Sequence, residues 1–245
     1  MINITDNNNI VNLMLNRPEK RNALSMELID AIHAGLDRIE QIDSMQVFIL
    51  AGAGSSFCAG MDLRGILQDP TAIEPMLHGL GRIFQRIRRL PVPTIACVQG
   101  AAIGGGCGLM VVCDFAFTHA ESTVGFPEVD LGVCPAVVAP WVIKKLGAGK
   151  ARAMLLAGGT ISGKQGFEAG LATHLCAADE LESATEAFAL NLARGGKGAL
   201  AVTKQWLNEL DGSLDEAVLD QAAVLSAEVV ASEEALTRLR PLYEK

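Results

Sequence analysis

Hydrophobic residues in the first 180 positions of the chain form two kinds of segment. Short apolar runs have the length of buried strands, and longer stretches repeat their apolar positions with a helical period. After Ser25, which can cap a helix, Leu28, Ile32 and Leu36 would share one helix face. The predicted strands are residues 2–5, 10–15, 47–50, 94–98 and 114–118, and the predicted helices are residues 25–39, 73–90 and 106–112. Strands alternating with helices predict an α/β fold, mainly parallel.

The pattern changes after residue 179. Strand signals stop, and helical segments rich in Ala and Leu follow at residues 180–192, 199–210, 214–230 and 233–239. No proline-rich linker precedes them, so we expect them to pack on the core or on a neighbouring subunit. We therefore predict a core of residues 1–185 and a helical C-terminal region of residues 186–245.

Composition and charge limit the classes of function. The 245 residues suit one large domain, and a hydrophobic fraction of 50% excludes a disordered chain. A net charge of −8 and only 4% aromatic residues argue against a nucleic-acid partner, which is bound through cations and stacking. The first ten residues lack the basic head and apolar run of a signal peptide, so we expect a cytoplasmic protein.

A charge-free stretch at residues 90–113 is long enough to cross a bilayer. It opens with Pro91 and Pro93, however, and five glycines interrupt it between residues 100 and 108. These residues favour a buried strand, a tight loop and a buried helix. We expect no membrane association.

Several other motifs do not indicate a site. The six cysteines form no Cys-x-x-Cys pair and the four histidines are widely spaced, so we expect free buried thiols and no metal. Residues 158–164 match a phosphate-binding loop, but Gln165 replaces the required Ser or Thr, and with Ser162 it predicts a helix capping box. The arginines at positions 82, 86, 88 and 89 are interpreted as a solvated helix face.

Three segments carry the candidate chemistry: residues 56–63, 98–108 and 126–132. The first two place small residues between a buried strand and a helix start, where backbone N–H groups can point outward. Two such turns could converge on one carbonyl oxygen as an oxyanion hole. The third places Glu128 after a proline in apolar surroundings, where desolvation would raise the pKa of a carboxyl group toward a useful acid–base range. An oxyanion hole with a general base is the resulting prediction.

The order of motifs resembles that of the crotonase family, the enoyl-CoA hydratase/isomerase group. The resemblance runs nearly end to end and rests on residues 16–18, 21–24, 57–63, 100–108, 127–128, 160–162, 168–171 and the basic C-terminus. It implies a spiral of ββα units, a helical C-terminal trimerisation region, and a homotrimer or a hexamer made of two trimers. It also implies an acyl-CoA thioester substrate, with coenzyme A entering as part of the substrate and no separate cofactor.

The resemblance also implies roles for individual residues. The N–H groups of Met61 and Gly105 would hold the thioester oxygen, and Glu128 would be the base. The remaining substrate contacts would come from Arg21, Ala23, Leu24, Ala59, Asp62, Leu63 and Gly104. Arg238 or Arg240 would reach a CoA phosphate, in the same subunit or in a neighbour.

One position departs from the pattern of well-known hydratases. They carry a first glutamate where this chain has Gly108, and only the second, Glu128, is present. Hydration delivers a hydroxyl to C3 and a proton to C2, which two carboxylates do more readily than one. A double-bond shift needs a single base that moves a proton between C2 and C4. Dienoyl-CoA isomerase activity is not expected, because Ala136 replaces a further acid of those enzymes.

Residues 106–109 and 131–140 are similar to a branch of methylglutaconyl-CoA-type and related hydratases, which tends to have glycine at the same position. This similarity makes a single-glutamate enoyl-CoA hydratase our first prediction and a Δ3-Δ2-enoyl-CoA isomerase the alternative. Asp130 could supply the missing acid if residues 128–131 are extended, because its side chain would then point the same way as that of Glu128. Two other classes stay open, a non-catalytic acyl-CoA binding protein and a thioester hydrolase.

Overall fold

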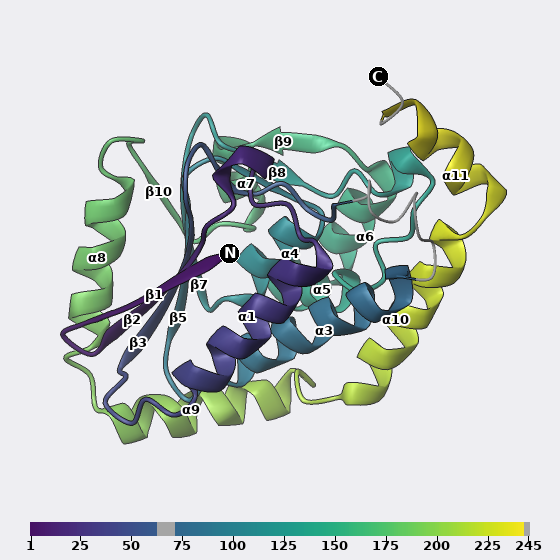
Figure 1. Cartoon of the computed structure of the whole chain (residues 1–245). Helices are drawn as coiled ribbons and strands as arrows, with labels where there is room; N and C mark the ends of the chain where they lie inside the picture. The colour runs from purple at the N-terminus through teal and green to yellow at the C-terminus, as the bar shows by residue number, and fades with distance from the viewer. Residues whose placement is uncertain (63–71, 243–245) are drawn as a thin grey trace.

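The computed structural model describes residues 1–62 and 72–242, and in this part of the chain two sheets form the framework (Figure 1). The larger sheet has the order β1 (Ile2–Asn7), β2 (Ile10–Leu15), β3 (Val47–Gly52), β5 (Thr94–Val98), β7 (Phe115–His119) and β10 (His174–Cys176). The smaller sheet has the order β4 (Ser56–Cys58), β6 (Ala101–Ile103), β8 (Thr123–Gly125) and β9 (Thr160–Ser162). Only the pairs β1/β2 and β8/β9 are antiparallel. The predicted α/β fold with mainly parallel strands is confirmed.

Helices cover both faces of the larger sheet (Figure 1). On one side lie α1 (Met26–Ile39), α3 (Ile73–Arg89) and α4 (Gly105–Val112), which enclose the main hydrophobic core. Helix α8 (Leu181–Leu192) packs on the opposite face through Leu181 and Phe188. The side chain of Ser25 accepts a hydrogen bond from the backbone N–H of Leu28, as predicted for the cap of α1.

In the charge-free stretch at residues 90–113, the predicted buried strand and buried helix are confirmed as β5 and α4, but the predicted loop between them contains the short strand β6. Across residues 1–62 and 72–242, no helix combines the length and apolar character needed to cross a bilayer. The glycine-rich motif at residues 158–164 ends α6 (Ala148–Ala157), forms β9 and starts α7 (Gly163–Ala169). Ser162 and Gln165 form the predicted capping box at the start of α7. This part of the sequence therefore has a local structural role.

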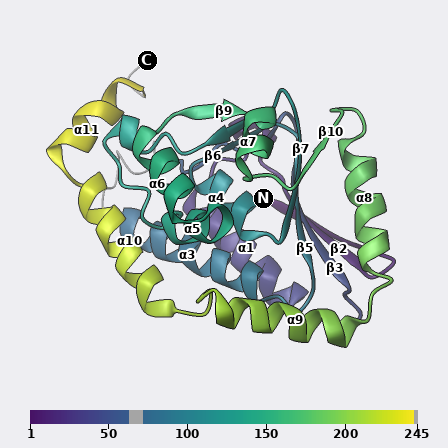
Figure 2. The ribbon, with the colours of Figure 1, turned by 180° about the vertical axis from the view of Figure 1, so that it is seen from behind.

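Three further helices complete the C-terminal region: α9 (Lys197–Leu210), α10 (Glu216–Val230) and α11 (Glu233–Leu239). They run around the outside of the helical layer, and α10 packs along α3 (Figures 1 and 2). A short turn at Arg240–Leu242 ends the described chain. The predicted boundary between residues 185 and 186 falls inside α8.

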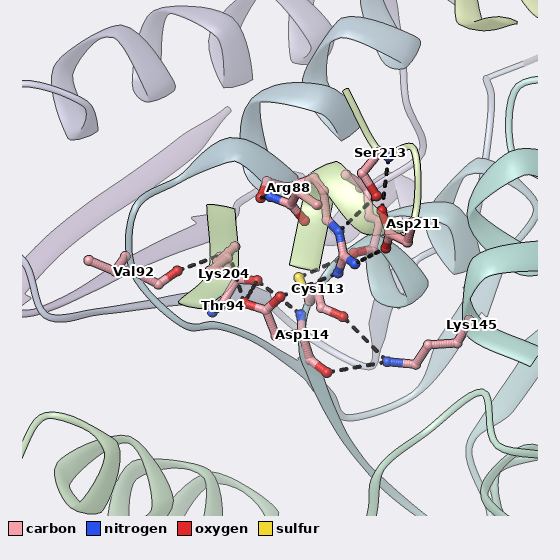
Figure 3. Close-up of polar contacts among 11 residues, drawn as sticks. Arg88, Val92, Thr94, Cys113, Asp114, Lys145, Lys204, Asp211 and Ser213 are labelled. Atoms are coloured by element: carbon pink, nitrogen blue, oxygen red, sulfur yellow. Dashed lines mark hydrogen bonds and ion pairs between the residues drawn. The ribbon is translucent and has the colours of Figure 1, made fainter. Parts of the chain in front are cut away.

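A polar cluster centred on Asp114 attaches α9 to the core (Figure 3). The Asp114 carboxylate accepts hydrogen bonds from the backbone N–H of Thr94 at 2.9 Å and from Lys204 Nζ of α9 at 2.8 Å. Arg88 Nη1 of α3 lies 3.3 Å from the same carboxylate, and Arg88 Nη2 lies 2.8 Å from Asp211. Burial lowers the pKa of the Lys204 ammonium, and the carboxylate of Asp114 opposes that change.

The arginine cluster of α3 differs from its prediction. Arg82 is exposed, but the side chains of Arg86 and Arg88 are only 22% and 18% exposed. Arg86 pairs with Asp37 and Glu40 of the α1 end. The interpretation of this helix face as solvated was wrong for these two residues, because acidic residues distant in sequence lie against them.

Replacing Lys204 by Met should lower the free energy of unfolding by about 1.5–3 kcal/mol, the range measured for hydrogen bonds to charged groups. The variant removes the cation from Asp114 and Val92 O but leaves Arg88 and Thr94 beside the carboxylate. Urea unfolding of the variant and of Lys150→Met, which changes an exposed lysine, would measure the difference. Equal stability of the two variants would contradict the role assigned to the cluster.

Candidate active site

Backbone hydrogen bonds join the first candidate turn to the segment around Asn22. The N–H of Ala59 donates to Arg21 O at 3.0 Å, and the N–H of Leu24 donates to Gly60 O at 2.8 Å. Asn22 is fully buried, and its Nδ2 donates to the carbonyl oxygens of Ser56 at 2.8 Å and Phe57 at 3.2 Å. This role of Asn22 was not predicted from the sequence, although the place of Asn22 within the Arg21–Leu24 motif was a signal.

The two glycine turns lie against each other. Gly60 and Gly104 have φ values of +91° and +54°, which favour glycine. A Cβ on Gly60 would lie 2.8 Å from Ile103 O and 4.0 Å from Gly105 N, so no side chain fits between the turns. In the described part of the chain, the N–H groups of Met61 and Gly105 donate to no other residue, whereas the N–H of Gly104 donates to Gly125 O at 2.9 Å.

Glu128 lies beside these turns. A Cβ on Gly104 would lie 2.9 Å from Glu128 Oε1, so the carboxyl group approaches the second turn closely. The residue is half-buried, but its Oε2 atom is completely shielded and has no hydrogen-bond partner among the described residues. This burial raises the pKa of Glu128 from its usual value to about 7. At neutral pH the group can therefore both accept and donate a proton.

One cavity of about 170 Å³ brings Met61, Gly105 and Glu128 together. Its other walls are largely aliphatic and come from three places: helix α3, the loop that follows Glu128, and helix α10. The residues on these walls are Ile73, Leu77, Leu80, Leu131, Val133, Cys134, Pro135, Val137, Val138, Ser226 and Val230. Among the described residues that line this cavity, Glu128 is the only one with a charged side chain.

Phe84 fills the space next to Gly108. A Cβ on Gly108 would lie 2.4 Å from Phe84 Cζ and 2.8 Å from Val138 Cγ1. Phe84 is fully buried and makes an edge-on contact with Trp141, with ring centroids 6.4 Å apart. A second carboxylate at this position is therefore excluded by packing as well as absent from the sequence.

Asp130 does not replace the missing acid. Residues Val129–Leu131 form a 3₁₀ turn, so the extended conformation on which the hypothesis depended is wrong. The Asp130 carboxylate accepts a hydrogen bond from the N–H of Gly159 at 2.7 Å. Its role in the structure is to hold the loop after Glu128 against the start of β9.

Comparison with known proteins identifies the family of the chain. The family model "Enoyl-CoA hydratase/isomerase" matches residues 5–238. The chain belongs to this family. The "Putative enoyl-CoA hydratase" of Thermus thermophilus is 30% identical over 95% of the chain and 94% of its own length. The 1,2-epoxyphenylacetyl-CoA isomerase of Escherichia coli is 30% identical over 86% of the chain and 83% of its own length.

A crystal structure supports the same relation. A "Putative enoyl-coA hydratase" from Mycobacterium avium paratuberculosis K-10 superposes with a TM-score of 0.90 and 26% identity, over 100% of the chain and 96% of its own length. The resemblance to the crotonase family is thus confirmed over nearly the whole chain. Family membership supports an enzyme of the hydratase/isomerase type but leaves the individual reaction open.

The other residues implied by the family resemblance have different surroundings. Ala23 and Leu24 lie in the segment joined to the first turn, and Arg21 is exposed beside it. Asp62 forms an ion pair with Arg17 at 2.9 Å, and Leu63 lies outside the described residues.

The side chain of Arg238 packs on the loop after Glu128. Its Nη1 donates a hydrogen bond to Asp130 O at 3.4 Å, and a Cβ atom added to Gly132 would lie 2.9 Å from Arg238 Cδ. Arg240 is exposed.

All six cysteines are free. Cys134 lines the cavity and Cys176 is half-buried, and the other four are buried. Burial raises the pKa of the Cys58 thiol to about 12. In residues 1–62 and 72–242, no three His, Cys, Asp or Glu side chains form a group suited to a metal ion.

Proposed function

We propose that this enzyme shifts the double bond of a 3-enoyl-CoA to the 2-position, with Glu128 as its single acid–base group. The observation that carries the proposal is the lone, shielded Glu128 carboxyl group in an aliphatic cavity whose second acid position is filled by Phe84. A group with a pKa near 7 suits a reaction in which the same atom first takes and then returns a proton.

The chemistry uses two parts of the site. Glu128 removes a proton from C2 of the thioester, and the electron pair moves into a dienolate whose negative charge rests on the thioester oxygen. The N–H groups of Met61 and Gly105 donate to that oxygen. The protonated Glu128 then gives the proton to C4, which leaves the double bond between C2 and C3. No water and no second acid take part.

Hydration of a 2-enoyl-CoA is the second candidate. The name of the Thermus thermophilus relative supports it, as does the sequence similarity to single-glutamate hydratases. A reacting water, however, needs two or more polar partners to hold it. The Ser226 hydroxyl donates its hydrogen to Cys134 O at 3.0 Å, so Glu128 is the only charged side chain on the described cavity wall that could activate a water. This difference favours isomerisation.

The two candidates give opposite absorbance changes. With 3-hexenoyl-CoA, isomerisation creates a conjugated thioester and its ultraviolet band rises. With crotonyl-CoA, hydration removes that band. We expect the first change and not the second. Loss of the crotonyl-CoA band would contradict isomerisation as the main reaction, and release of free thiol would indicate a thioester hydrolase.

We also propose that the CoA portion of the substrate is bound by the Arg21–Leu24 segment, Ala59, Asp62 and the C-terminal arginines, as the family resemblance implies.

Self-association into trimers or hexamers is a further proposal. Exposed apolar residues on α9 support it, because a row of them faces outward: Val202 at 69%, Trp206 at 58% and Leu210 at 65% exposure. Sedimentation analysis of the purified protein would test this proposal directly.

A further inference from the structure

The C-terminal helix α10 contributes a wall to the catalytic cavity. Ser226 and Val230 both line the cavity, although they lie 98 and 102 residues after Glu128 in the sequence. They are four residues apart on one helix, so both side chains belong to the same helix face. Their exposed fractions are 1% and 2%, so this face of α10 is buried within the chain.

The surroundings of Ser226 make this wall apolar. Its hydroxyl donates to Cys134 O at 3.0 Å, which satisfies the polar group and fastens α10 to the loop after Glu128. Helix α3, which packs along α10, supplies Ile73 and Leu77 to the same cavity. The walls formed by α3 and α10 therefore present aliphatic groups to a ligand, while the two glycine turns and Glu128 supply the polar groups of the cavity.

The size of the cavity limits the acyl group. An apolar cavity of roughly 150 Å³ takes up a benzene molecule, which has about six carbon atoms. The cavity here is about 170 Å³ and must also hold the reacting carbons beside Glu128. An acyl chain of about four to six carbons would fill it from the glycine turns to α10.

We propose that Val230 is a specificity-determining residue that sets the length of the acyl chain, and that the substrates are short, uncharged acyl-CoA thioesters. This inference rests on the proposed function only in requiring that acyl-CoA binds in the cavity. Val230 is the last residue of α10 and lines the cavity, so its side chain would limit the space open to the acyl chain. Shortening this side chain enlarges the cavity on its α10 wall, and lengthening it reduces the space there.

The test compares Val230→Ala and Val230→Leu with the unmodified enzyme. Isothermal titration calorimetry with butyryl-, hexanoyl- and octanoyl-CoA gives affinities that do not depend on turnover. We expect Val230→Ala to raise the affinity for octanoyl-CoA relative to butyryl-CoA by about 10-fold, since one methylene group in an apolar pocket changes selectivity by about 10-fold or more. Val230→Leu should change the ratio in the opposite direction.

Val224→Ala is the matched control, because it makes the same change on the same helix at a residue that is 41% exposed. It should leave the ratio unchanged. A ratio that is equal in Val230→Ala, Val230→Leu and Val224→Ala would overturn the inference, whatever happens to overall affinity. Normal length selection without turnover of 3-hexenoyl-CoA would instead refute the proposed reaction and leave the role of Val230 intact.

Discussion

Replacing Glu128 by Gln should lower kcat/KM by about 10²–10⁴, the usual contribution of one general acid–base group. Gln has nearly the same shape but cannot take up a proton at neutral pH. The two glycine turns do not change, so binding of hexanoyl-CoA should stay within a few-fold of that of the unmodified enzyme. Glu121→Gln, which changes an exposed glutamate, is the matched control and should keep full activity. Full activity in Glu128→Gln would refute the assignment of the base.

The raised pKa of Glu128 means that Glu128→Gln, which lowers activity, should also raise the stability of the folded protein at high pH. The pKa of Glu128 is about 7 in the native state and 4.5 for an ordinary glutamate, which stands for the unfolded state. Between about pH 4.5 and 7 the native carboxyl group therefore binds more protons than the unfolded one. Stability from this group is therefore present at low pH and is lost as the pH rises through that window. Glu128→Gln should be more stable than the unmodified enzyme by about 1–3 kcal/mol at pH 8 and not at pH 4.5. Thermal unfolding at the two pH values would show the difference.

Replacing Gly105 by Pro should reduce the rate by about 10²–10³, as expected when one oxyanion donor is lost. Proline removes the N–H that we assign to the thioester oxygen. Gly105 is the first residue of α4, a position where proline is tolerated because no helical hydrogen bond is lost there. The expected loss is therefore chemical, and circular dichroism should show a folded variant.

Gly105→Ala serves as the control for this variant. A Cβ at this position lies 2.9 Å from Leu80 Cδ2 and 3.2 Å from Leu24 Cδ1, so both substitutions strain the same side chains. Only proline also removes the donor. Equal rates in the alanine and proline variants would show that crowding, and not the N–H group, accounts for the loss.

The sequence predicted the long elements of this fold well. The apolar period of α1 and α3 and the buried runs of β3 and β5 are strong local signals, and the structure shows each within about two residues of its prediction. The smaller sheet was missed. Its strands β4, β6, β8 and β9 have three residues each and lie in glycine-rich segments, where pairing with distant strands decides the structure and local pattern does not.

The site shows the same division between local and distant information. The glycine turns and Glu128 could be identified from their motifs, because each motif is contiguous in sequence. Three features could not be identified from motifs: the filling of the Gly108 site by Phe84, the hydrogen bond from Ser226 to Cys134, and the wall formed by Val230. Each joins residues that are more than 20 positions apart and have no distinctive local pattern. The error at Asp130 arose because the chain turns after Glu128, where an extended strand had been assumed.

The most direct test of the single-base account follows one labelled proton. A 3-enoyl-CoA carrying deuterium at C2 is converted by the enzyme in ordinary water, and the position of deuterium in the 2-enoyl product is read by mass spectrometry and NMR. If Glu128 removes a deuteron from C2 and delivers it to C4 before it exchanges with solvent, a measurable part of the deuterium appears at C4. Product with no deuterium at C4, in which the removed deuteron has been lost to solvent, would contradict the account and would require a water or a second group in the proton path.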